Sequence, residues 1–164
     1  MRSMLVIIRI MGNIIILNII NMFSEKKINK YFELAKNASK FSDFHKQKIG
    51  AIIVNKSHIL SVGWNTQKTS TLQKTYNKRA SQPWADNYPN CMHAEINAIQ
   101  RLSKRSGEDF SKCHIFIYRE GGGSKRLAKP CQACEKAIRD LGITNVHYTG
   151  LNSFIYEKYL EGEL

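Results

Sequence analysis

The alternation of strand-like and helix-like segments between residues 49 and 148 is the feature that most restricts how this chain can fold. Residues 49–54 and 58–64 are short runs rich in β-branched side chains, and Asn55-Lys56-Ser57 between them suits an antiparallel hairpin. Apolar spacing then predicts a helix at residues 94–102, a strand at 114–118, a helix at 134–141 and a strand at 145–148. A hairpin followed by this αβαβ order predicts an α/β fold, in which helices cover both faces of a mixed sheet.

Three further segments complete the secondary-structure prediction. Apolar residues between residues 28 and 38 recur at the spacing of one helix face. Residues 66–90 are polar and aperiodic, so we expect a long loop, and loops of that length are usually functional or mobile. A last short helix is expected at residues 153–160.

Composition narrows the class of protein. The chain has 164 residues, 43% hydrophobic and 23% charged, which fits one folded domain and excludes wholesale disorder and a multispan membrane protein. The four cysteines include a Cys-x-x-Cys pair, which favours metal or redox chemistry in a reducing compartment, so we expect a cytoplasmic protein. The formal net charge of +12 suits phosphorylated metabolites or polyanions, although charge alone does not identify nucleic acid as a partner.

The N-terminal segment, residues 1–21, is almost entirely aliphatic between residues 5 and 20. One arginine and several asparagines interrupt it, which argues against a transmembrane span, and it lacks the small residues of a signal-peptide cleavage site. The best interpretation is that translation starts at Met22, directly before Ser24-Glu25, a good helix N-terminus. The domain would then span residues 22–164, and membrane association is the weaker alternative.

Two short motifs at predicted helix N-termini carry the chemistry: residues 91–99 (CMHAEINAI) and 130–134 (PCQAC). Cys131 and Cys134 lie three apart on one helical turn, so both can turn toward a single metal ion. A helix N-terminus also favours the thiolate form that binds metal. With His93 as a third ligand, the fourth tetrahedral position stays open to water, as in catalytic zinc sites.

Glu95 decides what such a site could do. It lies two residues from His93 and therefore does not share its helix face, which leaves the carboxylate free to move protons beside an activated water. Two other interpretations of the cysteines remain open. One is a closed structural zinc site that adds Cys91, and the other is a redox pair of Cys131 and Cys134.

The pattern H-x-E followed by P-C-x-x-C is typical of zinc-dependent nucleobase deaminases. The chain resembles the cytidine and deoxycytidylate (dCMP) deaminase superfamily over residues 28–149, and residues 88–99 resemble the deoxycytidylate branch most. It departs from the family by placing residues 119–129 between a strand and Pro130. The resemblance implies a three-layer α/β/α fold, with His93, Cys131 and Cys134 as zinc ligands, Glu95 as proton shuttle and Asn65 as a substrate contact.

The resulting functional prediction is hydrolytic deamination of a cytosine base, in dCMP or a related nucleotide, to the uracil counterpart and ammonia. An alternative is a deaminase of cytosine or adenine in single-stranded DNA or tRNA, and a second is a non-catalytic zinc-stabilised binding module. The resemblance also implies a homo-oligomer. Basic residues that could contact phosphate are Lys68, Lys74, Lys78, Arg79, Lys125, Arg126 and Lys129. The other histidines, His45, His58, His114 and His147, follow no metal-ligand or catalytic pattern.

Overall fold

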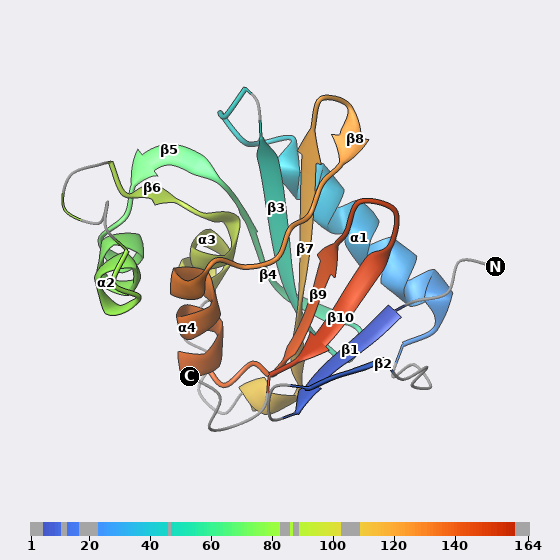
Figure 1. Ribbon diagram of the computed structural model, residues 1–164. Helices are drawn as coiled ribbons and strands as arrows, with labels where there is room; N and C mark the ends of the chain where they lie inside the picture. Colours follow the sequence, from blue (N-terminus) through green and yellow to red (C-terminus); the bar gives the residue numbers. More distant parts are fainter. Residues whose placement is uncertain are drawn as a thin grey trace.

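The structure, a computed structural model, describes residues 5–10, 13–16, 23–45, 47–82, 86, 89–102 and 109–159. Its centre is an eight-stranded mixed sheet with the strand order β2-β1-β10-β9-β7-β3-β4, in which β8 pairs with β7 (Figure 1). The strands are β1 (Leu5–Ile10), β2 (Asn13–Ile16), β3 (Lys48–Asn55), β4 (His58–Trp64), β7 (Cys113–Gly121), β8 (Ser124–Lys125), β9 (Asn145–Thr149) and β10 (Phe154–Lys158). A separate two-stranded sheet joins β5 (Thr66–Thr69) to β6 (Cys91–Met92).

Strand directions confirm the predicted mixed sheet. The strand β7 runs parallel to β9 and antiparallel to β3, which forms the predicted hairpin with β4. The strand β7 continues beyond its predicted end and turns into β8 through Gly122 and Gly123, whose φ angles of 62° and 75° favour glycine. Residues 119–129, which set this chain apart from the family pattern, therefore contain a short hairpin extension.

Helices cover both faces of the sheet, which confirms the three-layer arrangement (Figure 1). They are α1 (Glu25–Ser39), α2 (Thr71–Arg79), α3 (Ala94–Arg101) and α4 (Gln132–Asp140), with a 3-10 turn, η1, at Phe110–Lys112. Helix α1 packs against β3 and β7 on one face, and its N-cap is Ser24, as the sequence predicts. Helix α3 packs against β3 and β4 on the other face, and α2 packs against α4.

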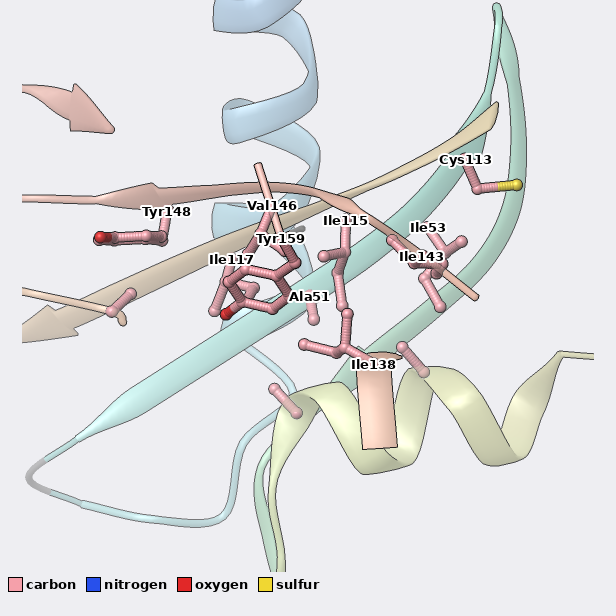
Figure 2. Packing of buried hydrophobic residues seen from close by; sticks show 13 residues of the cluster. Ala51, Ile53, Cys113, Ile115, Ile117, Ile138, Ile143, Val146, Tyr148 and Tyr159 are labelled. Atoms are coloured by element: carbon pink, nitrogen blue, oxygen red, sulfur yellow. The ribbon is translucent and has the colours of Figure 1, made fainter. Parts of the chain in front are cut away.

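The core on the α3 and α4 side fixes the helices that carry the two motifs. Ile138 of α4 lies against sheet residues that include Ile115 and Ile117, all fully buried (Figure 2). Gly63 in β4 lets α3 approach closely, because a Cβ there would overlap the backbone of Ala98. Close packing of this kind holds the N-termini of both helices at one edge of the sheet.

Two secondary-structure predictions are wrong. Residues 66–90, expected to be a loop, contain β5 and α2, while residues 83–85 and 87–88 lie outside the described part. Residues 153–160, expected to form a helix, contain β10, which pairs antiparallel with β9. Its Phe154-Ile155-Tyr156 run consists of β-favouring side chains, and pairing with β9 outweighs the weak helical spacing.

The N-terminal segment extends the sheet where its backbone is described. The strand β1 pairs in parallel with β10, and β2 pairs with β1. A start at Met22 stays a prediction, and Met22 itself lies outside the described residues. Among the described residues, no helix has the length and apolar character needed to cross a membrane.

Candidate metal centre

The N-termini of α3 and α4 converge and bring the two motifs together. His93 is the N-cap residue of α3, and Cys131 is the N-cap residue of α4. The potential ligand atoms of His93, Cys131 and Cys134 all lie within 4.8 Å of one another. Nδ1 of His93 is 3.6 Å from Sγ of Cys131 and 3.3 Å from Sγ of Cys134.

This geometry fits a zinc ion. Ordinary Zn–N and Zn–S bonds in a tetrahedral site separate a nitrogen and a sulfur ligand by roughly 3.5 Å, and the two measured separations lie on either side of that value. Two thiolates and one imidazole are also a donor set that zinc prefers, and three protein ligands leave one position open. The three predicted ligands are therefore placed as a catalytic zinc site requires.

The two thiols differ in their surroundings. A hydrogen bond from Cys134 lowers the pKa of Cys131 to about 4. The same hydrogen bond, together with burial, raises the pKa of Cys134. Cys131 is therefore the thiol that loses its proton more readily, and the thiolate is the form that ligates metal.

Glu95 lies in the first turn of α3, where only 5% of its surface is exposed. It lines a cavity of about 470 Å³ together with His93 and Cys131. Burial raises the pKa of its carboxyl group, while the neighbouring His93 partly offsets that effect. A carboxyl group with a raised pKa accepts a proton more readily than an ordinary carboxylate, and at the edge of a cavity it can return that proton to a bound molecule.

Two cations also line this cavity, Arg119 and Lys129. The Nζ of Lys129 lies 3.2 Å from the carboxylate of Glu157, a buried residue of β10. Arg119 donates from Nη1 to the carbonyl of Leu127 at 3.2 Å, and its buried Nε has no hydrogen-bond partner in the described part of the chain. The sequence analysis named Lys129 but missed Arg119, whose position at the end of β7 places it in the cavity.

Asn65 lines the same cavity, and both polar atoms of its side chain already bind the backbone. Its Oδ1 accepts from the amide of Ile49 at 2.8 Å, and its Nδ2 donates to the carbonyl of Gln47 at 2.9 Å. These bonds hold the start of β3 against the end of β4. A contact between Asn65 and substrate stays a prediction.

The sequence analysis also missed Gln73, which supports the metal centre from α2. Its Oε1 accepts from the backbone amide of His93 at 3.0 Å, and its Nε2 donates to Asn77 at 2.9 Å. The sequence feature that could have revealed this helix is Ser70-x-x-Gln73, a capping-box spacing that marks a helix start. In the structure Ser70 is indeed the N-cap residue of α2.

The other two cysteines lie outside the ligand group. Cys91 lines the cavity, but its thiol donates to the carbonyl of Gln67 at 3.6 Å. Cys113 is fully buried at the start of β7. Among the described residues, the group able to hold a metal consists of His93, Cys131 and Cys134, so a fourth thiol ligand from Cys91 finds no support.

Comparison with known proteins agrees with this geometry. The family model of the cytidine and deoxycytidylate deaminase zinc-binding region matches residues 25–149. The chain belongs to this deaminase family. It is therefore a zinc-dependent enzyme of the class that hydrolyses C–N bonds. Membership of this family does not support the alternative of a non-catalytic binding module. No curated protein sequence matches the chain significantly.

Solved structures of deaminases share the fold. The dCMP deaminase of cyanophage S-TIM5, in apo form, is 23% identical with a TM-score of 0.55, and the match covers 84% of this chain and 100% of that one. The same phage enzyme in complex with dCMP and dUMP has 23% identity and a TM-score of 0.53, covering 77% and 82% of the two chains. The cytidine deaminase of Burkholderia pseudomallei has 19% identity and a TM-score of 0.55, covering 83% and 93%. At these identities the likeness concerns the fold.

Proposed function

We propose that this deaminase acts on cytosine in a deoxycytidylate-type nucleotide, producing the uracil counterpart and ammonia. The observation that carries the proposal is the composition of one cavity, in which Glu95 lies beside the His/Cys/Cys group and Arg119 lies on the wall. The phage enzyme of the same fold was crystallised with dCMP and dUMP, which supports a nucleotide substrate.

In this proposal His93, Cys131 and Cys134 hold the zinc ion. When bound in such a site, zinc lowers the pKa of a coordinated water from about 15.7 toward about 7. His93 and Cys131 are the N-cap residues of α3 and α4, and Cys134 lies in the first turn of α4. The backbone amide of His93 is also fixed, because it donates a hydrogen bond to Oε1 of Gln73. Support of this kind around a ligand keeps its orientation and raises metal affinity.

Glu95 is assigned as the proton shuttle. It accepts a proton from the attacking water and returns it to the pyrimidine ring nitrogen. It then takes the second proton from the hydroxyl group that is now bonded to the ring carbon and delivers it to the amine as the C–N bond breaks, so that water and substrate yield the uracil product and ammonia. The raised pKa of Glu95 suits both directions of transfer. Asn65, which also lines the cavity, is assigned as a substrate contact in addition to its backbone bonds.

Arg119 is assigned as the main contact for the 5′-phosphate. Lys129 is already paired with the buried Glu157, so much of its charge is neutralised. Arg119 has no acidic partner among the described residues and keeps a buried Nε–H without an acceptor. A guanidinium group binds phosphate through paired hydrogen bonds, which would satisfy that donor.

The test is ammonia release by the zinc-loaded chain from three substrates: dCMP, deoxycytidine and a cytosine-containing single-stranded oligonucleotide. We expect dCMP to be the best substrate. The matched control is Glu95→Gln, which should lower turnover about 10²- to 10⁴-fold while zinc content stays the same. Release from the oligonucleotide alone would replace the mononucleotide proposal with a polynucleotide deaminase, and unchanged turnover in Glu95→Gln would remove Glu95 from the mechanism.

A further inference from the structure

A second cavity, of about 500 Å³, lies at the other end of the central sheet. It opens between the turn of the β3–β4 hairpin, the starts of β7 and β9, and the beginning of α1. The metal centre lies near Ile49 of β3, whereas this cavity lies near Asn55 of the same strand. Six residues of extended strand, at about 3.3 Å each, separate the two by roughly 20 Å.

Positive charge dominates the lining of this cavity. The described lining residues are Phe23, Lys27, Asn55, Lys56, Ser57, Ser111, Lys112, His114, Asn145 and Lys158, four of which are lysines and none of which is acidic. Lys112 pairs with the exposed Asp109 at 2.9 Å, but neither Lys56 nor Lys158 has an acidic partner among the described residues. Like charges gathered around a concave surface attract and concentrate anions.

The lining of the cavity includes a buried histidine. His114 lines the cavity with only 2% of its surface exposed. Its Nδ1 is hydrogen-bonded to Nε2 of His147 at 2.9 Å, and the strands β7 and β9 that carry the two rings are neighbours in the sheet. The His114 ring is therefore held in place, and its NMR signals can report on a ligand that enters the cavity.

We propose that this second cavity binds a small anion that carries several phosphate groups. Four ammonium groups from separate segments match the charge of a polyphosphate chain. The hydroxyls of Ser57 and Ser111 add donors for its oxygens, and the volume is in the range of small-molecule sites. The site is separate from the catalytic cavity, and the proposal does not depend on the substrate of the deaminase.

A small anion fits this cavity better than a nucleic acid strand. Single-strand binding surfaces combine an extended basic groove with exposed aromatic rings on which bases stack. The aromatic ring lining this cavity belongs to Phe23, which is only 7% exposed and packs edge-on against His114 with ring centroids 4.7 Å apart. It forms a wall and offers no stacking platform.

The test is calorimetric titration of the full zinc-loaded chain with inorganic tripolyphosphate, together with NMR of the histidine rings. We expect saturable binding that weakens as salt rises, and a shift of the His114 ring signals on binding. Each of Lys56→Ala and Lys158→Ala should weaken binding about tenfold, as expected for loss of one charged hydrogen bond. Lys40→Ala is the matched control and should leave affinity unchanged, because Lys40 is an exposed lysine at the C-terminal end of α1 that lines neither cavity.

Four outcomes would overturn the proposal. Equal weakening by Lys40→Ala would mean that the binding of tripolyphosphate depends only on overall charge. If Arg119→Ala weakened tripolyphosphate binding while Lys56→Ala and Lys158→Ala did not, the anion would bind in the catalytic cavity. Absence of saturable binding, or tighter binding of a single-stranded oligonucleotide through the same lysines, would exclude a small-polyphosphate site.

Discussion

The two ends of the central sheet carry cavities of similar volume, about 470 and 500 Å³, that are built in different ways. At the metal end, a few residue types at fixed spacing on two helix N-termini define the chemistry, and each side chain has a distinct role. At the other end, lysines from four segments far apart in the sequence contribute together. Function at the first end should therefore depend on single atoms, whereas binding at the second should depend on the combined charge of the lysines that line that cavity.

The largest effect is expected at the ligands of the metal end. Replacing Cys131 with Ala removes a thiolate ligand, so zinc affinity should fall by more than the 10- to 100-fold typical of changes next to a ligand. Deaminase turnover should be lost with the zinc. Cys91→Ala is the matched control, because Cys91 lines the same cavity but lies outside the ligand group. Zinc content after dialysis checks both, and equal zinc loss in the control would contradict the ligand assignment.

Replacement of Arg119 tests whether the catalytic cavity also recognises the phosphate charge of the substrate. Loss of a charged hydrogen bond in Arg119→Ala should raise the KM for dCMP about 10- to 100-fold, with a smaller change in kcat. The Arg119→Ala variant and the parent enzyme should turn over deoxycytidine equally well, because deoxycytidine has no phosphate. Arg119→Lys should recover part of the loss, because it keeps the charge and loses the paired hydrogen bonds. A KM increase of equal size for deoxycytidine would show that Arg119 shapes the cavity and does not bind phosphate.

The buried histidines at the other end of the sheet, His114 and His147, should make the stability of the fold sensitive to acid. Burial lowers the pKa of His114 to about 4 and also lowers that of His147. The unfolded chain protonates both imidazoles below about pH 6.5, while the folded chain does not, so stability is complete above that pH and falls as the pH drops toward 4. At pH 5, His114 alone should cost about 2 kcal/mol of unfolding free energy.

Urea unfolding at pH 7 and pH 5 measures this loss. The variant His114→Gln should lose less stability between the two pH values than the parent chain. The exposed His58 is the matched control, and His58→Gln should keep the full loss. An identical pH dependence in all three proteins would show that other groups govern acid unfolding.

The difference between the two ends also explains how much the sequence could predict. The hairpin, the αβαβ order, and the convergence of His93 and Cys131 follow from apolar spacing and from helix N-termini at one sheet edge, and the structure confirms them. The second cavity has no such signal. His114 and His147 are 33 residues apart and pair only because β7 and β9 are neighbours in the sheet.

Helix α2 shows a further limit of sequence interpretation. Hydrophobic spacing finds helices that bury apolar faces, but the fully or largely buried residues of α2 are Gln73 and Asn77. Hydrogen bonds from Gln73 to Asn77 and from Asn77 to Asn90 compensate for the burial of these polar side chains. The buried face of α2 therefore shows no stripe of apolar residues in the sequence. A polar segment that is buried through hydrogen bonds therefore resembles a loop in the sequence. Its start was still marked by the Ser70-x-x-Gln73 capping spacing.

A last prediction tests how Gln73 of α2 supports the metal centre. Gln73→Ala removes the acceptor of the His93 amide and the donor to Asn77, and unpaired buried groups cost about 1–3 kcal/mol. Zinc affinity should also fall about 10- to 100-fold, because the backbone of a ligand loses its anchor. The control is Gln100→Ala, an exposed glutamine that donates to Ser70. Because that change leaves His93 untouched, it should alter the unfolding free energy by less than about 0.5 kcal/mol and leave zinc affinity unchanged. If both variants lowered zinc affinity equally, α2 as a whole would support the centre, and Gln73 would have no specific role in holding His93.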